Sequence, residues 1–126
     1  MKFLFDNNLG IKLAKGMQGF GEDAVHVTEV SLQNVPDSQL FQYASQHNMV
    51  IISRDLRMRR NPAEHHAIRK YKIGIFFLGG KNRNTCQLIE QTVRNWRQIK
   101  ERAAKEKRPF AFLIPPKGIK FDSYPL

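Results

Sequence analysis

The sequence predicts an α/β fold, a three-layer α/β/α sandwich with a mainly parallel central sheet. Short apolar runs alternate along the chain with amphipathic stretches of helical period, and the connections between them are short. This alternation is typical of parallel strands joined by crossover helices. The 126 residues suit a single core, and no repeat or linker divides them. We therefore expect one domain over residues 1–126, with an α/β core at 1–108 and a C-terminal extension at 109–126.

Four apolar runs are predicted as the strands of the core. The first, Lys2–Phe5, is short and continuous, as expected of a strand buried on both faces. The predicted strands are Lys2–Phe5, Ala24–Val27, Met49–Ser53 and Ile73–Leu78. Past them, Phe110–Ile114 and Ile119–Phe121 flank a Pro-Pro-Lys-Gly turn, which predicts a hairpin or an edge extension.

Apolar residues at helical spacing predict the connections between these strands. The predicted helices cover residues 7–17, 37–48, 62–69 and 84–105. Asn84 is expected to cap the last and longest of them. The inward face of that helix is predicted to consist of Leu88, Val93, Trp96, Ile99 and Ala103.

Three aspartates lie at positions that suit a shared site. Asp6 follows the first strand, Asp55 comes shortly after the third, and Asp37 opens a helix. Open α/β sheets bind ligands outside the carboxyl ends of their strands, and right-handed crossovers bring the ends of the first and third strands to one edge. Carboxylates that converge repel one another, and a hard divalent cation resolves the repulsion. The pattern therefore predicts a small metal-dependent nuclease.

Each aspartate also has a structural alternative. Asp37 follows Pro36 and suits the N-cap of its helix, Asp55 suits the start of a turn, and Asp6 suits a cap for the helix after it. Capping does not exclude ligation, because a carboxylate at a helix start can present one oxygen outward. These alternatives stay open at the level of sequence.

The charge of the chain is unevenly distributed. The formal net charge is +10, with three Lys/Arg against five Asp/Glu through Ser53 and 18 against six from Arg54 onward. An acidic cluster in the first part and a basic surface in the second suit a polyanion that is cut at a metal ion. Solubility and docking of an acidic partner are the alternative explanations of the basic charge.

Three motifs resemble one known family. They are Phe3-Leu4-Phe5-Asp6-Asn7-Asn8-Leu9, the aspartate-led stretch from Asp37 to Ala44, and Val50-Ile51-Ile52-Ser53-Arg54-Asp55, which ends in Ser-x-Asp. In order and spacing they are similar to the compact prokaryotic PIN-like domains, which often serve as the toxin of a toxin–antitoxin pair. The resemblance covers roughly the first 80 residues, and the final segment matches less specifically.

The resemblance implies a ribonuclease that uses Mg²⁺ or Mn²⁺. It assigns Asp6, Asp37 and Asp55 as the catalytic and metal-binding carboxylates, and Ser53 as a hydroxyl that supports the site. Asn7 stands where this subgroup often has Glu, and its amide oxygen is a further, weaker ligand. Glu29 is the nearest candidate for a fourth acid, although a solvated loop charge explains it more simply. The implied chemistry is in-line attack of water on an RNA phosphodiester, leaving 5′-phosphate and 3′-hydroxyl ends.

Basic residues beside Asp55 are predicted to contact RNA phosphates, because the planar guanidinium can bind two oxygens. The predicted contacts are Arg54, Arg57, Arg59, Arg60 and Lys81. A solvated basic loop and a contact for an acidic antitoxin are the alternatives.

The remaining features of the sequence limit the possible functions and locations of the protein. Cys86 is the only cysteine, so no disulfide forms within the chain, and a cytoplasmic location without membrane association is expected. The histidines lack metal-binding spacing, which argues against a zinc site. The expected partners are RNA, a cognate antitoxin and a second copy of the chain. The alternative function is a PIN-like module that binds RNA or protein without cleavage.

Overall fold

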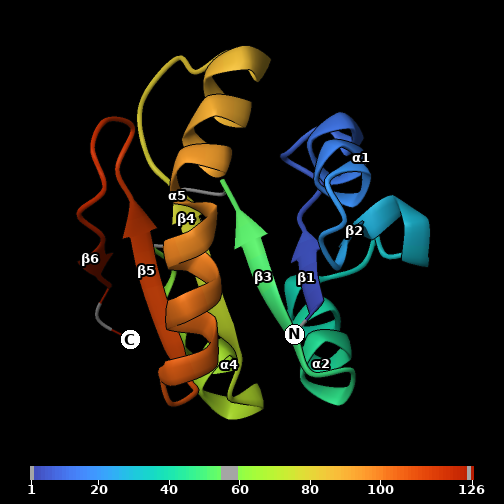
Figure 1. The fold of residues 1–126 in the computed structure, drawn as a ribbon. Helices are drawn as coiled ribbons and strands as arrows, with labels where there is room; N and C mark the ends of the chain where they lie inside the picture. Colours follow the sequence, from blue (N-terminus) through green and yellow to red (C-terminus); the bar gives the residue numbers. More distant parts are fainter. Residues whose placement is uncertain (1, 55–59, 125) are drawn as a thin grey trace.

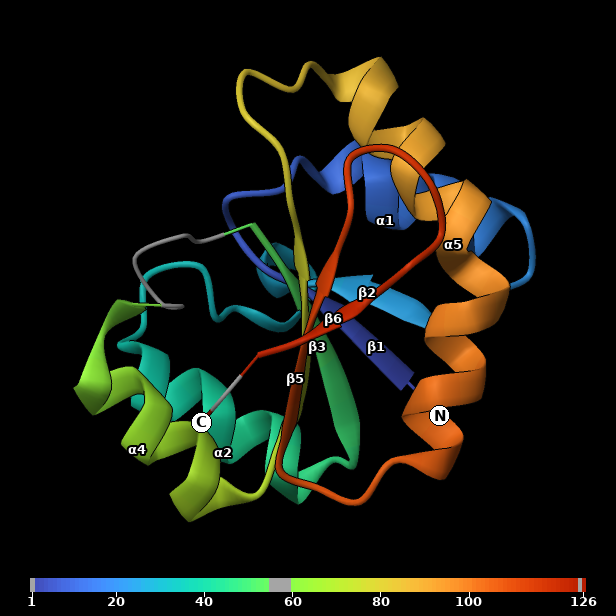
Figure 2. The same cartoon turned by 90° about the vertical axis from the view of Figure 1, so that its left-hand side faces the viewer.

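The computed structural model describes residues 2–54, 60–124 and 126, which form a three-layer α/β/α sandwich (Figures 1 and 2). Its six-stranded sheet has the order β2-β1-β3-β4-β5-β6. The strands are β1 (Lys2–Phe5), β2 (Ala24–His26), β3 (Met49–Ser53), β4 (Gly74–Leu78), β5 (Phe110–Ile114) and β6 (Asp122–Ser123). The strands β1 to β5 pair in parallel, and only β6 pairs antiparallel, with β5. The predicted fold class is confirmed.

Helices cover both faces of the sheet, as Figure 2 shows. The helices of the described chain are α1 (Ile11–Gly19), α2 (Asp37–Gln46), α4 (Pro62–Tyr71) and α5 (Thr85–Lys105). The apolar residues of α1 and α5 share one core cluster with Phe3, Phe5 and the aromatic residues of β5. Those of α2 and α4 share a second cluster with Leu4 and Ile51. Every residue of β3 and β4 is buried, which explains why these strands read as continuous apolar runs.

The first helix begins later than the sequence predicts. Residues 7–10 form a turn, and α1 starts at Ile11 with Gly10 at its N-cap. The side chains of Asn7 and Asn8 donate to the carbonyl of Gln33 and the hydroxyl of Ser53, so they serve the carboxyl edge of the sheet rather than the helix. Helical periodicity alone does not show that side chains such as those of Asn7 and Asn8 bond to other segments instead of extending the helix.

The inward face of α5 is also more polar than predicted. Val93 is 46% exposed, so its assignment to the inward face is wrong, and Gln91, Thr92 and Asn95 are buried instead. Gln91 Nε2 donates to the carbonyls of Gly79 (3.1 Å), Ile114 (3.1 Å) and Pro115 (3.0 Å). Carbonyls at the ends of β4 and β5 need donors when a helix covers them, and an apolar side chain cannot supply one.

The C-terminal segment is divided between core and edge. Phe110–Ile114 continues the parallel sheet as β5, and Phe110, Phe112 and Ile114 join the core cluster of α1 and α5. The expected hairpin is present, but its second strand is β6 rather than Ile119–Phe121. None of the helices in the described ranges is both long and apolar enough to cross a membrane.

Candidate active site

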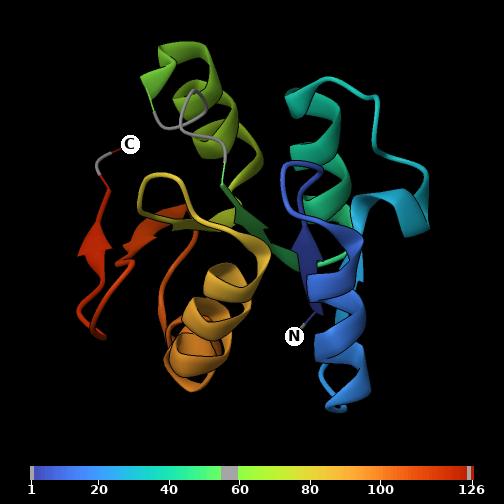
Figure 3. The same cartoon turned by 90° about the horizontal axis from the view of Figure 1, so that it is seen from above.

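The order of the strands reverses between β1 and β3. The chain passes from β1 outward to β2, then returns through α2 to β3 on the other side of β1. Loops that leave such a switch point diverge, and the carboxyl edge there is the usual ligand site of a doubly wound sheet. Figure 3 looks down on this edge. The predicted meeting of the first and third strands at one edge is confirmed by their direct pairing.

Asp6 is the residue that follows β1 at this switch point. Its side chain is close to fully buried, with 8% of the residue exposed. One carboxylate oxygen, Oδ2, accepts from Ser53 Oγ at 2.9 Å, and the other, Oδ1, accepts from the backbone N–H of Asn7 at 2.7 Å. Ser53 ends the neighbouring strand and is itself fully buried. The structure therefore brings together two predicted site residues that are 47 positions apart in the chain.

Asn8 connects the loop after β1 to the end of β3. Its Nδ2 donates to Ser53 Oγ at 3.4 Å, and its Oδ1 accepts from the backbone N–H of Arg54 at 3.0 Å. Asn8 thus contacts the hydroxyl that holds Asp6 and fixes the backbone at Arg54. The role of Asn8 is not visible in the sequence, because only the strand pairing shows which residues face it.

His26 fixes the loop that follows Asp6 from the other side. Its Nδ1 accepts from the backbone N–H of Thr28 at 3.2 Å, so the ring proton resides on Nε2, which donates to the carbonyl of Leu9 at 2.6 Å. His26 is 3% exposed, so its ring is a buried hydrogen-bonding group. No sequence pattern indicates this role, because His26 stands alone in the chain.

Asp37 lies at the start of α2. Because α2 leads from the loops at the carboxyl edge back to the amino end of β3, its first residue lies at the same edge of the sheet as Asp6. Pro36 occupies the N-cap, so Asp37 is not the capping residue, and the half-buried carboxylate belongs to the first turn. The link from Asn7 Nδ2 to Gln33 O (3.4 Å) draws the loop that precedes Asp37 toward the turn after β1.

Several predicted residues lie outside the described part of the chain. These are Asp55, Arg57 and Arg59. Within residues 2–54, 60–124 and 126, no three His, Cys, Asp or Glu side chains are grouped so that they could hold a metal ion. That finding does not test the set Asp6, Asp37 and Asp55, because its third member is not among those residues.

Glu29, the nearest fourth acid in the sequence, is occupied elsewhere. Its carboxylate accepts from the backbone N–H of His26 and from Gln18 Nε2, both at 2.9 Å, and pairs with Lys15 at 2.9 Å. The hydrogen bond from Lys15, followed by that from His26, lowers the pKa of Glu29 below its ordinary value. Glu29 therefore caps the short 3-10 helix η1 (Val27–Val30) at the end of β2.

The predicted phosphate contacts differ in their surroundings. Arg60 and Lys81 are exposed. Arg54 is half-buried, and its guanidinium donates to the carbonyls of Gly80 (2.9 Å) and Leu78 (3.4 Å). Arg54 therefore joins the end of β3 to the loop after β4.

Comparison with known proteins agrees with this architecture. A family model described as a PIN like domain matches residues 1–80. The chain belongs to the PIN-like domain family. The resemblance of the three motifs to PIN-like domains is thereby confirmed, and the superfamily includes metal-dependent nucleases. No curated protein and no solved structure matches the chain.

Proposed function

We propose that this PIN-like domain is a Mg²⁺- or Mn²⁺-dependent endoribonuclease that hydrolyses RNA phosphodiester bonds. One observation carries the proposal: a buried aspartate at the switch point of the sheet is held by the Ser of a Ser-x-Asp motif on the adjacent strand. Asp6, Asp37 and Asp55 are the proposed metal-binding carboxylates, and Asn7 is a further oxygen ligand. Ser53 orients Asp6.

The residues present fit a hard divalent cation. Mg²⁺ and Mn²⁺ prefer carboxylate, amide and water oxygens, and all the proposed ligands are of this type. The two carboxylate oxygens of Asp6 accept hydrogen bonds from Ser53 Oγ and from the backbone N–H of Asn7. Hydrogen bonds of this kind hold a metal ligand in one orientation.

Hydrogen bonds within the chain orient the residues of the proposed site. Ser53 and the Asn7 backbone fix the direction of the Asp6 carboxylate, and Asn8 fixes the segment that leads to Asp55. A bound divalent cation supplies Lewis-acid stabilisation of charge on the phosphate and lowers the pKa of water. In this proposal the Asp6 carboxylate accepts a proton from the attacking water, and no side-chain nucleophile is needed.

The second candidate function is RNA or protein binding without cleavage. Asn7 in place of an acid, and the engagement of Glu29 in the cap of η1, favour it, because both reduce the negative charge available to a cation. The basic charge of the chain serves either function. A role as the toxin of a toxin–antitoxin pair, a cytoplasmic location and a homodimer are parts of the leading proposal.

The test is cleavage of a panel of single-stranded and structured RNAs with Mg²⁺, Mn²⁺ or EDTA. We expect the wild type to cleave with metal and not with EDTA, and Asp6→Asn and Asp55→Asn to lose at least about 100-fold in rate. Asp122→Asn is the matched control, because Asp122 is exposed on β6 at the far edge of the sheet. Equal cleavage by the wild type and both site variants would mean that the activity is a contaminant and that the proposal is wrong.

A further inference from the structure

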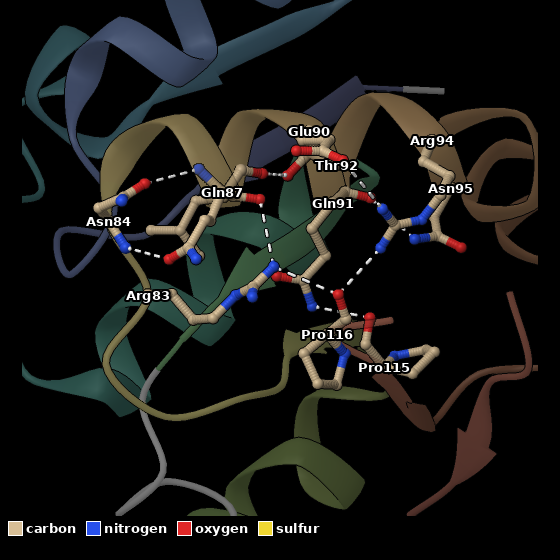
Figure 4. Close-up of polar contacts among 11 residues, drawn as sticks. Arg83, Asn84, Gln87, Glu90, Gln91, Thr92, Arg94, Asn95, Pro115 and Pro116 are labelled. Carbon is tan, nitrogen blue, oxygen red and sulfur yellow. Dashed lines mark hydrogen bonds and ion pairs between the residues drawn. The ribbon is translucent and has the colours of Figure 1, made fainter. Parts of the chain in front are cut away.

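Three arginines converge where the loops after β4 and β5 meet. Arg54 Nη2 donates to the carbonyl of Gly80 at 2.9 Å. Arg83 Nη2 and Arg94 Nη2 both donate to the carbonyl of Pro116, at 3.2 Å and 3.0 Å, as Figure 4 shows. We call Arg54, Arg83 and Arg94 the arginine cluster.

The cluster is built around Gly80. This residue has φ +106°, and a Cβ atom there would lie 3.0 Å from Arg83 Cδ and 2.7 Å from Pro116 Cβ. Arg54 binds the carbonyl of Gly80 while Arg83 packs against its Cα, so the two side chains meet at one residue. A residue with a side chain at this position would push the loop and the cluster apart.

Within residues 2–54, 60–124 and 126, the positive charge of the cluster is only partly compensated. Among the described residues, the one carboxylate that pairs with it is Glu90, at 3.7 Å from Arg94 Nη1. Burial, and then the nearby charge of Arg83, lower the pKa of Arg54 below its ordinary value. Backbone carbonyls orient the guanidinium groups but do not neutralise them.

Holding together the loops after β4 and β5 does not by itself explain why three arginines lie close to one another. Gln91, a neutral residue on the same helix as Arg94, already donates to the carbonyls of Gly79 and Ile114 and to that of Pro115, the last of which Figure 4 shows. A neutral amide is therefore sufficient to satisfy carbonyls here. Cations held close together at a loop edge are instead suited to an anionic ligand with several oxygens, because a guanidinium binds phosphate through two parallel hydrogen bonds.

The location connects the cluster to the candidate active site. Ser53 at the end of β3 pairs with Phe77 of β4, so the loop at Gly80 follows directly beside it. The ends of β4 and β5 lie one and two strand spacings from β3, which is about 5–10 Å. A strand of RNA that enters the switch point and continues over the sheet edge passes the cluster.

We propose that the arginine cluster is a phosphate-binding subsite for the RNA strand beside the scissile bond. The identity of the polyanion rests on the proposed function. Arg54 lies within the residues matched by the family model, whereas Arg83 and Arg94 lie outside them, so the C-terminal part of this chain supplies two of the three arginines.

The experiment measures binding of fluorescein-labelled single-stranded RNA to the full-length Asp6→Asn protein in EDTA, over a range of NaCl concentrations. Removing one cation that binds a phosphate should reduce the slope of log affinity against log salt by about 0.7. We expect this reduction, with about 10-fold weaker binding, in Arg83→Gln and in Arg94→Gln. Arg97→Gln is the control, because Arg97 is also on α5 but is highly exposed and pairs with Glu101.

A decrease in affinity in Arg97→Gln as large as in the cluster variants would overturn the proposal, because general basic charge would then explain binding. Circular dichroism and urea unfolding check that each variant folds. If Arg83→Gln does not fold, the exposed Arg94 carries the test alone. Because no cleavage is measured, RNA binding that depends on the cluster supports the subsite even if the nuclease proposal fails. Cleavage by a protein whose RNA binding is unaffected by Arg83→Gln and Arg94→Gln would reject only the subsite.

Discussion

Replacing Ser53 with alanine tests how the site holds its aspartate. The hydroxyl donates to Asp6 Oδ2 at 2.9 Å, between two side chains that are at most 8% exposed. A hydrogen bond to a charged group contributes about 1.5–3 kcal/mol to stability, and its removal leaves a buried carboxylate oxygen without that donor. The longer hydrogen bond from Asn8 Nδ2, at 3.4 Å, adds little.

We therefore expect Ser53→Ala to lower the free energy of unfolding by about 2 kcal/mol, or the melting temperature by about 8 °C for a domain of this size. The assay is urea unfolding, with an unchanged m-value as the sign that the unfolded state is unaffected. Ser45→Ala on the exposed side of α2 is the control and should change stability by less than about 0.5 kcal/mol.

A double-mutant cycle with Asp6→Ala isolates the pair. If Ser53 acts through Asp6, the cycle should give a coupling energy of about 1.5–3 kcal/mol. A destabilisation below about 0.5 kcal/mol in Ser53→Ala, or additive effects in the cycle, would refute the reasoning that this hydrogen bond fixes the aspartate.

Two further predictions follow from packing and charge. At Gly74 a Cβ atom would lie 2.2 Å from the ring of Phe110, so Gly74→Ala should destabilise the protein by about 3 kcal/mol or more. Gly16 in α1 has open space around it, so Gly16→Ala should instead stabilise the protein by up to about 1 kcal/mol. Urea unfolding of both variants checks these two expectations. The pKa of Glu29 is lowered by Lys15, so the stability that this carboxylate adds is complete above its ordinary value of 4.5 and is lost as the pH falls through the folded-state value. Because the pair is partly exposed, Glu29→Gln should cost less than about 1 kcal/mol at neutral pH, and the difference from wild type should shrink as the pH falls below 4.5. A difference that grows on acidification would contradict the assignment.

The sequence predicts the fold well where burial is uniform. The strand β3 is found at its predicted bounds, Met49–Ser53, because a β-branched run buried on both faces has no competing pattern. Asn84 caps α5 as predicted, since its bond with the N–H of Gln87 is local in sequence. The prediction fails where contacts with residues far along the chain determine which side of a helix faces inward. Val93 is exposed because Gln91 faces inward to satisfy carbonyls at the ends of β4 and β5.

The candidate site is predictable in part for the same reason. Asp6 and Ser53 each end an apolar run, so their residue types and positions are visible in the sequence. Their contact depends on the pairing of β1 with β3, which periodicity does not reveal. The contributions of Asn8 and His26 depend on that pairing and on the turn after β1, so no sequence pattern predicts them.

The most direct test of the account is Mn²⁺ binding to the metal-free protein, measured by calorimetry or by the electron paramagnetic resonance of free Mn²⁺. We expect the wild type to bind the ion, and Asp6→Asn, Asp37→Asn and Asp55→Asn each to weaken binding by at least about 10-fold. Asp122→Asn should bind like the wild type. A wild type that binds no Mn²⁺, or site variants that all bind it as well as Asp122→Asn, would contradict the claim that these aspartates share one ion.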